Sequence, residues 1–104
     1  MAKYRMVRLV RTNSSEIYLV WEGNRRIGQF DVHYADTMIH GSLILEGELS
    51  GADRSELVAQ LDEDIVSSHL PSFEREDFIL TIFRGEEVDS FSYPAPEEEA
   101  LEEE

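Results

Sequence analysis

Two turn signals, each set between runs of β-forming residues, constrain the fold of this chain more than any other feature. Gly23-Asn24 separates residues 16–22 from residues 25–34, and both turn residues tolerate the positive φ of a two-residue hairpin loop. Asp36-Thr37 is the corresponding turn before residues 38–49. An earlier β-rich run, ending in a cluster of turn formers at 12–15, adds a strand in front of them. The pattern predicts four consecutive antiparallel strands.

The turn positions also predict which side chains share a face, because successive residues of a strand point to opposite sides. A two-residue loop at Gly23-Asn24 places Ile17 opposite Phe30. The loop at Asp36-Thr37 places Val32 opposite Gly41 and His33 opposite His40. The predicted core face of these strands is therefore formed by Ile17, Leu19, Trp21, Phe30, Val32 and Tyr34.

A helix and a final hairpin are predicted in the second half. Asp53 is the expected N-cap, with Glu56 three residues later, and apolar residues then recur at helical spacing. We expect the helix over residues 53–68. Residues 78–84 and 88–93 are predicted as two further strands, joined by a turn at Gly85-Glu86.

These elements predict one α+β domain over residues 1–93. It has an antiparallel sheet of about six strands in the order ββββαββ, with one helix packed on one face. A chain of 104 residues is long enough to bury such a core without disulfides. The last residues, 94–104, read PAPEEEALEEE and are expected to form a disordered acidic tail.

Composition excludes several classes of function. The chain has no cysteine, which removes disulfides, thiolate metal sites and cysteine nucleophiles together. Its net charge of -14, with 9 basic against 23 acidic residues, disfavours binding to nucleic acid or to an anionic membrane. We find no signal-peptide pattern and no apolar run long enough to span a bilayer, so the expected location is the cytoplasm.

The motifs of common enzymes are absent: the sequence contains no GxGxxG, phosphate-binding loop, HExxH or GxSxG pattern. One constellation of chemical groups remains. His33 and His40 are predicted to oppose each other on the outer side of a hairpin, with Asp31 one step along. Such a set suits either a metal ion or an acid-base pair, while the simpler interpretation is a pair of surface histidines. No cofactor is predicted.

Apolar residues on the side of the sheet away from the helix give a further prediction. A sheet with one wet face normally carries polar residues there, and an extended apolar patch usually marks an interface. The predicted interface residues are Tyr18, Val20, Ile44, Ile79, Phe83 and Val88.

The sequence therefore favours a small non-enzymatic protein-interaction domain. It is expected to form a homodimer through its open sheet face and to present its acidic surface to a basic protein partner. Two alternatives remain open at this point. One is a small metal-dependent or acid-base enzyme using Asp31, His33 and His40. The other is an acidic mimic of nucleic acid that occupies the groove of a basic protein.

Overall fold

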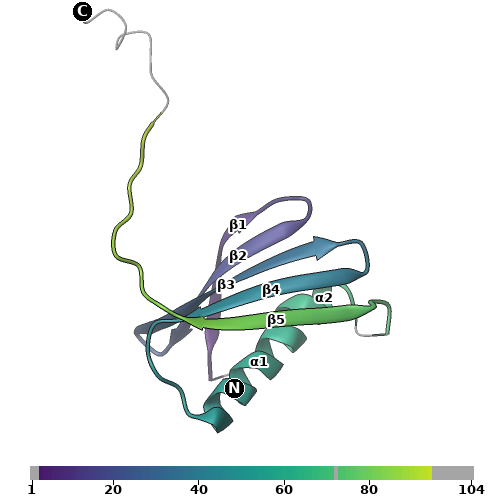
Figure 1. Ribbon diagram of the computed structural model, residues 1–104, viewed down its shortest axis with the longest axis horizontal. Helices are drawn as coiled ribbons and strands as arrows, with labels where there is room; N and C mark the ends of the chain where they lie inside the picture. Colours follow the sequence, from purple (N-terminus) through teal and green to yellow (C-terminus); the bar gives the residue numbers. More distant parts are fainter. Residues whose placement is uncertain (1–2, 72, 95–104) are drawn as a thin grey trace, which may run out of the picture.

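The computed structural model describes residues 3–71 and 73–94, which form a five-stranded sheet with a helix on one face (Figure 1). The first three pairings in the sheet are antiparallel, and the last strand runs parallel to its neighbour. The predicted α+β class is confirmed, with five strands rather than six. The strands lie side by side in chain order: β1 (Arg5–Arg11), β2 (Ser15–Glu22), β3 (Arg25–Ala35), β4 (Met38–Leu45) and β5 (Asp77–Arg84).

A helical connection between β4 and β5 makes their parallel pairing possible, because parallel neighbours need a crossover. Helix α1 (Gly51–Leu61) continues through a π-helical segment, η1 (Asp62–Val66), into the short α2 (Ser67–His69). Its apolar side packs on the sheet. The buried core consists of Tyr4, Val20, Ile27, Phe30, Val32, Tyr34, Ile39, Leu43, Leu45, Leu57, Leu61, Ile65 and Val66.

The helix begins earlier than predicted. Ser50, not Asp53, is the N-cap: its hydroxyl oxygen accepts a hydrogen bond from the Asp53 backbone N–H at 3.0 Å. Asp53 lies in the first turn, where a carboxylate is favoured by the helix dipole. Its side chain also pairs with Lys3 at 2.8 Å. That hydrogen bond lowers the pKa of Asp53 and raises the pKa of Lys3, so the contact ties the start of the chain to the start of the helix.

The second predicted hairpin is confirmed residue by residue. Val32 pairs with Gly41 and His33 pairs with His40. Asp36 occupies the turn with a φ of 62°, a conformation that aspartate tolerates better than most residues.

The first predicted hairpin has the right turn but the wrong register. Trp21 pairs with Arg26 as expected, and then a bulge shifts the next pair to Val20 and Gly28. Ile27 is the extra residue, and both Ile27 and Gly28 are buried on the helix-covered side. A shift of one residue exchanges the two faces of a strand, so the predicted core positions Ile17, Leu19 and Trp21 lie on the opposite side. The core positions Phe30, Val32 and Tyr34 were predicted correctly.

The predicted sixth strand, residues 88–93, is not formed, and the antiparallel pairing of the last two strands is wrong. The chain does not turn at Gly85-Glu86. Instead the Gly85 N–H donates to the Leu45 carbonyl at 2.8 Å, which prolongs the parallel ladder with β4 by one step. The following residues leave the sheet as an extended segment (Figure 1). The predicted acidic tail, apart from its first residue Pro94, lies outside the described residues.

Candidate functional site

The side of the sheet away from the helix, called the open face below, follows from the strand registers. Cross-strand partners share a face, so each register defines a row of neighbouring side chains. Three rows cross the sheet. They are Val7, Leu19, Gln29, Ile44 and Phe83; Val10, Ile17, Asp31, Ser42 and Thr81; and Ser15, His33, His40 and Ile79. Arg5, Trp21 and Arg26 complete the open face at the end where β1 begins.

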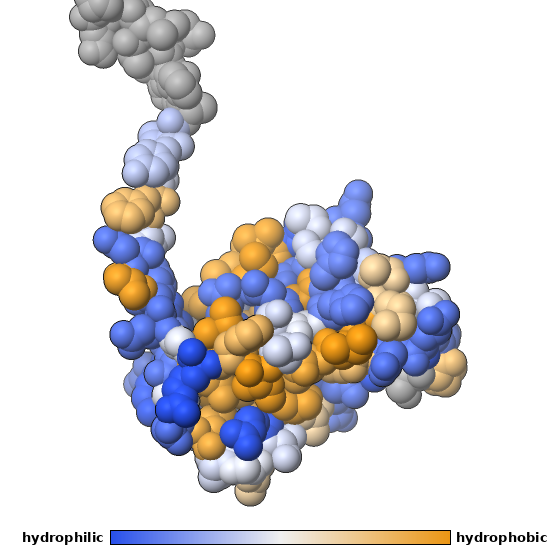
Figure 2. Space-filling view, viewed as in Figure 1, coloured by the Kyte–Doolittle hydropathy of each residue, from blue (hydrophilic) through white to orange (hydrophobic). Residues whose placement is uncertain are grey.

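Apolar side chains on the open face gather in two clusters, one on each side of a polar centre. The first cluster lies on β1 and β2 and is formed by Val7, Val10, Ile17, Leu19 and Trp21. The second lies on β4 and β5 and is formed by Ile44, Ile79 and Phe83. Ile79 is 42% exposed and Phe83 is 53% exposed. Hydrophobic atoms follow β5 across the surface in Figure 2.

Between the clusters runs a strip of polar side chains on β3 and β4, defined as the polar strip: Gln29, Asp31, His33, His40 and Ser42. Asp31 is the one carboxylate among the open-face residues named above. A second carboxylate, Asp77, lies on the open face at the start of β5, where it is paired with Met38. The other acidic residues of the described chain lie on the helix, in loops, on the covered side of the sheet, or beyond β5. The open face therefore carries few carboxylates for a strongly acidic protein.

Three of the predicted interface residues, Ile44, Ile79 and Phe83, lie on the open face. Two do not. Val20 is 0% exposed, and Tyr18 packs against Phe30 under the helix-covered side with ring centroids 6.5 Å apart. The bulge at Ile27 causes both errors because it reverses β2. Val88 is on no strand, and it is 91% exposed in the segment that follows β5.

The structure brings the predicted His33, His40 and Asp31 to one place. The two histidines are directly opposed, and Asp31 is in the next row. They line a shallow hollow of about 280 Å³ together with Ser15, Ile17 and Ser42. The Asp31 carboxylate accepts a hydrogen bond from the Gln29 amide at 2.9 Å. Within residues 3–71 and 73–94, no three histidine or acidic side chains lie close enough together to hold a metal ion.

A buried carboxylate escaped prediction because it depends on the bulge. Glu16 is 8% exposed, on the covered side of β2. Its oxygens accept hydrogen bonds from the hydroxyls of Tyr18 at 3.0 Å and Tyr34 at 3.4 Å, and Arg8 and Arg11 lie 3.5 and 3.6 Å away. The carboxylate is thus fully partnered, as a buried charge must be. We interpret this cluster as structural support for the edge of the sheet.

The tyrosines of this cluster are held in their neutral form. Burial raises the pKa of Tyr34 far above its ordinary value, and the Glu16 carboxylate raises it further. Burial and the hydrogen bond to Glu16 raise the pKa of Tyr18 as well. The Tyr34 ring stacks on His69 with centroids 3.8 Å apart, which joins the end of the helix to β3.

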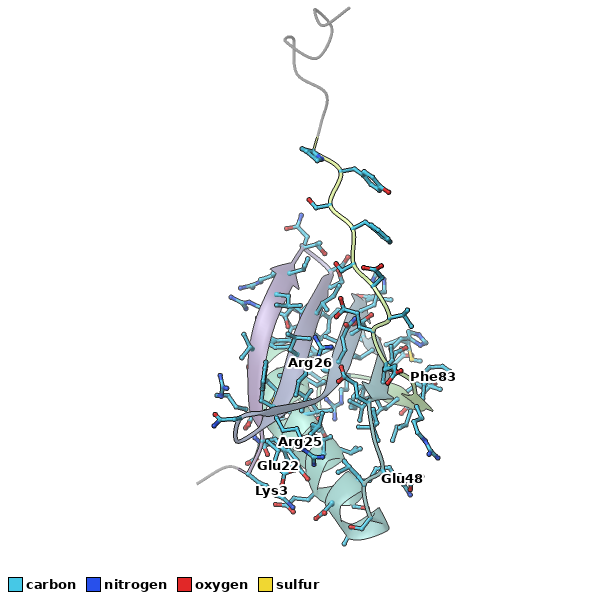
Figure 3. The ribbon with its side chains drawn as sticks, turned by 90° about the vertical axis from the view of Figure 1, so that its left-hand side faces the viewer. Lys3, Glu22, Arg25, Arg26, Glu48 and Phe83 are labelled. Atoms are coloured by element: carbon cyan, nitrogen blue, oxygen red, sulfur yellow. The ribbon has the colours of Figure 1, made fainter. Side chains whose placement is uncertain are left out.

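Arg26 holds the place where the chain leaves the sheet. Its guanidinium lies 2.7 Å from Glu46 and 3.2 Å from Glu87. A hollow of about 260 Å³ lies beside it, lined by residues that include Gln29 and Ile44 of the open face. Arg26 and Phe83 lie on either side of the point of departure (Figure 3). The segment after β5 therefore starts beside the open face.

Comparison with known proteins adds no functional information. In the described part of the chain, no helix has both the length and the apolar character needed to cross a membrane. No protein-family model, curated protein or solved structure matches this chain.

Proposed function

We propose that this protein is a non-enzymatic interaction domain whose open face packs against the open face of a second copy. One observation carries the proposal: the two apolar clusters of the open face are uncovered. Exposed patches of this kind usually mark interfaces. Their burial in a dimer is favourable at about 25 cal/mol for each Å² of apolar surface removed from water, before the cost of association is subtracted.

Charge favours a second copy on this face over the face that the helix covers. Two chains with a net charge of -14 repel each other wherever their carboxylates meet. The open face has Arg5 and two carboxylates, Asp31 and Asp77, while its Arg26 is already paired with Glu46 and Glu87. The helical connection on the other face carries five carboxylates, so repulsion is weaker on the open face. A two-fold pairing through one self-complementary patch is also the commonest form of oligomer.

The arrangement of the clusters suits such a pairing. Consider a two-fold axis that lies in the interface and runs along the polar strip. It places the cluster of one copy that contains Leu19 and Trp21 against the cluster of the other copy that contains Ile79 and Phe83. The polar strips then meet in the centre, where the histidines and Ser42 have hydrogen-bonding groups to offer each other. Each apolar cluster is covered by the other cluster of the second copy.

The test is the mass in solution at several protein and salt concentrations. Wild type should give a dimer whose association tightens with salt, because salt screens the repulsion between the two acidic chains. Replacing Ile79 and Phe83 by glutamate should yield a 12.0 kDa monomer. Phe73→Glu is the matched control, because Phe73 is 83% exposed but follows the helix, away from the open face.

Two results would contradict the proposal. One is a wild-type mass of 12.0 kDa under all conditions. The other is a dimer that is disrupted equally by Phe73→Glu and by the open-face substitutions. Circular dichroism of each variant establishes whether the fold is retained before the masses are compared.

A further inference from the structure

The residues after β5 form an extended arm, defined here as Glu86–Tyr93, that stands away from the body of the protein (Figures 1 and 2). Its apolar side chains are largely exposed: Val88 is 91%, Phe91 71% and Tyr93 86% exposed. Valine, phenylalanine and tyrosine all favour strands. The arm thus has the composition of a strand, but it pairs with no strand in the described chain.

The outer edge of β1 offers a matching site. β1 is at the end of the sheet, so one side of its backbone has no neighbouring strand among the described residues. Such an edge is a ready template for another strand. β1 has seven residues, against eight in the arm. Leu9 and Val10, at its bulged end, are 54% and 45% exposed.

Charge distinguishes this edge from the other edge of the sheet. β1 carries Arg5, Arg8 and Arg11. The arm carries Glu86, Asp89 and Glu87, of which Glu87 is paired with Arg26 of its own chain. Arg8 and Arg11 lie beside Glu16, yet their side chains remain 47% and 59% exposed. The β5 edge instead begins at Asp77, directly after Glu76, and Arg84 at its other end is already paired with Glu48. An acidic arm is attracted to β1 and repelled at the start of β5.

The arm cannot pair along β1 of its own chain. It leaves β5, four strand spacings from β1, which is about 19 Å at 4.8 Å for each spacing. An extended chain advances about 3.3 Å per residue, so roughly six residues are spent in crossing the sheet. Those that remain before Pro94 are too few to follow β1. An arm that pairs along β1 must therefore come from another copy.

We propose that the arm of one copy pairs with the β1 edge of a second copy and adds a sixth strand to that copy's sheet. The exchange is reciprocal, so two arms close a symmetric pair. This inference goes beyond the open-face proposal and does not depend on it. The arm would bind through backbone hydrogen bonds at the edge of β1, whereas the open-face proposal uses side chains on one face of the sheet. In the added strand Phe91 and Tyr93 lie on one face of the partner's sheet and Val88 on the other. Contact with the partner on both faces accounts for their exposure in the single chain.

Disulfide trapping tests the exchange in the full chain, and the absence of natural cysteine makes every crosslink assignable. A Leu9→Cys chain is mixed with a Ser90→Cys chain under mild oxidation. The mixed dimer should form roughly ten-fold faster than with either control cysteine, because pairing raises the effective concentration of the two thiols. In the controls, the Ser90→Cys chain is mixed with a Ser55→Cys chain, altered on α1, or with a Thr81→Cys chain, altered on β5. Both control positions are exposed.

Charge provides a second readout. Glu86→Lys and Asp89→Lys in the arm should slow the Leu9–Ser90 crosslink, whereas Glu63→Lys and Asp64→Lys on the helical segment should not. Ile79→Glu and Phe83→Glu should leave it unchanged, which separates this inference from the open-face proposal. A crosslink no faster than with Ser55→Cys overturns the inference. So does a faster crosslink to Thr81→Cys, or a disulfide formed only within one chain that carries both Leu9→Cys and Ser90→Cys.

Discussion

Gly28 on β3 lies directly against the backbone carbonyl of Ile44 on β4, with no room between them for a side-chain carbon. The oxygen belongs to the backbone of a central strand and cannot move without separating the two strands. Gly28→Ala should therefore destabilise the protein by about 1–3 kcal/mol, the usual cost of overpacking. Urea unfolding followed by circular dichroism measures it.

Gly47→Ala is the matched control for this prediction, because a carbon added there meets nothing within 4 Å. Its unfolding free energy should stay within about 0.5 kcal/mol of wild type. If the two substitutions change the unfolding free energy equally, the close approach of β3 and β4 is not the reason why a side chain at position 28 is destabilising.

The helix cap gives a second prediction. Ser50→Ala removes the hydroxyl that accepts from the Asp53 N–H, and this should reduce the unfolding free energy by about 1 kcal/mol. Ser55→Ala, at an exposed position inside α1, should have a much smaller effect of either sign. Urea unfolding measures both variants. If they lose the same unfolding free energy, the Ser50 cap does not stabilise the helix as its geometry indicates.

Alkaline unfolding should report on Tyr34. Its pKa in the folded protein is raised above the ordinary value of 10.0, so the folded state keeps a proton that the unfolded state loses. The resulting stability is fully present below pH 10 and falls above it, by up to about 1.4 kcal/mol for each pH unit. Tyr34→Phe should make this decline shallower. Denaturant titrations at several alkaline pH values measure the slope.

Tyr93→Phe serves as the control for the pH experiment, because that side chain is 86% exposed. It should leave the slope of wild type unchanged. If stability falls with pH as steeply in Tyr34→Phe as in wild type, the Glu16 cluster does not hold this phenol in its neutral form.

Zinc should not stabilise the protein, although His33 and His40 are opposed. Their nearest carboxylate, Asp31, is engaged with Gln29, and no third ligand completes a site within the described residues. The melting temperature should be the same with and without micromolar zinc, in wild type and in the His33→Ala, His40→Ala variant. A rise in wild type that the double variant lacks would restore the metal hypothesis.

The two hairpins show what determined the success of prediction from sequence. The loop at Asp36-Thr37 leads into a regular ladder, so counting from the turn gave every pair of β3 and β4 correctly. The loop at Gly23-Asn24 leads into a bulge after two pairs, and counting failed from Val20 onward. Gly28 was the available signal, because a glycine inside a strand often marks a bulge or a close backbone approach.

The same reasoning explains which candidate site residues were placed correctly. Ile44, Ile79 and Phe83 lie on regular strands, so alternation put them on the open face. Tyr18 and Val20 were misplaced with the whole of β2. The arm was wrongly predicted as a strand because Val88–Tyr93 has the composition of one. It could pair with β5 only if the chain reversed direction after β5, and no local residue determines whether the chain does so.

The parallel pairing of β5 with β4 also sets the order in which the sheet assembles. β1 to β4 are joined by short turns, and each hairpin closes a small loop at little entropic cost. β5 reaches β4 only after the whole helical connection has been made, so it docks late. A chain that ends before β5, during synthesis or after proteolysis, leaves the hydrogen-bonding edge of β4 open beside Ile39 and Leu43, and such edges recruit other chains. Docking of the last strand is thus the step that removes this aggregation hazard.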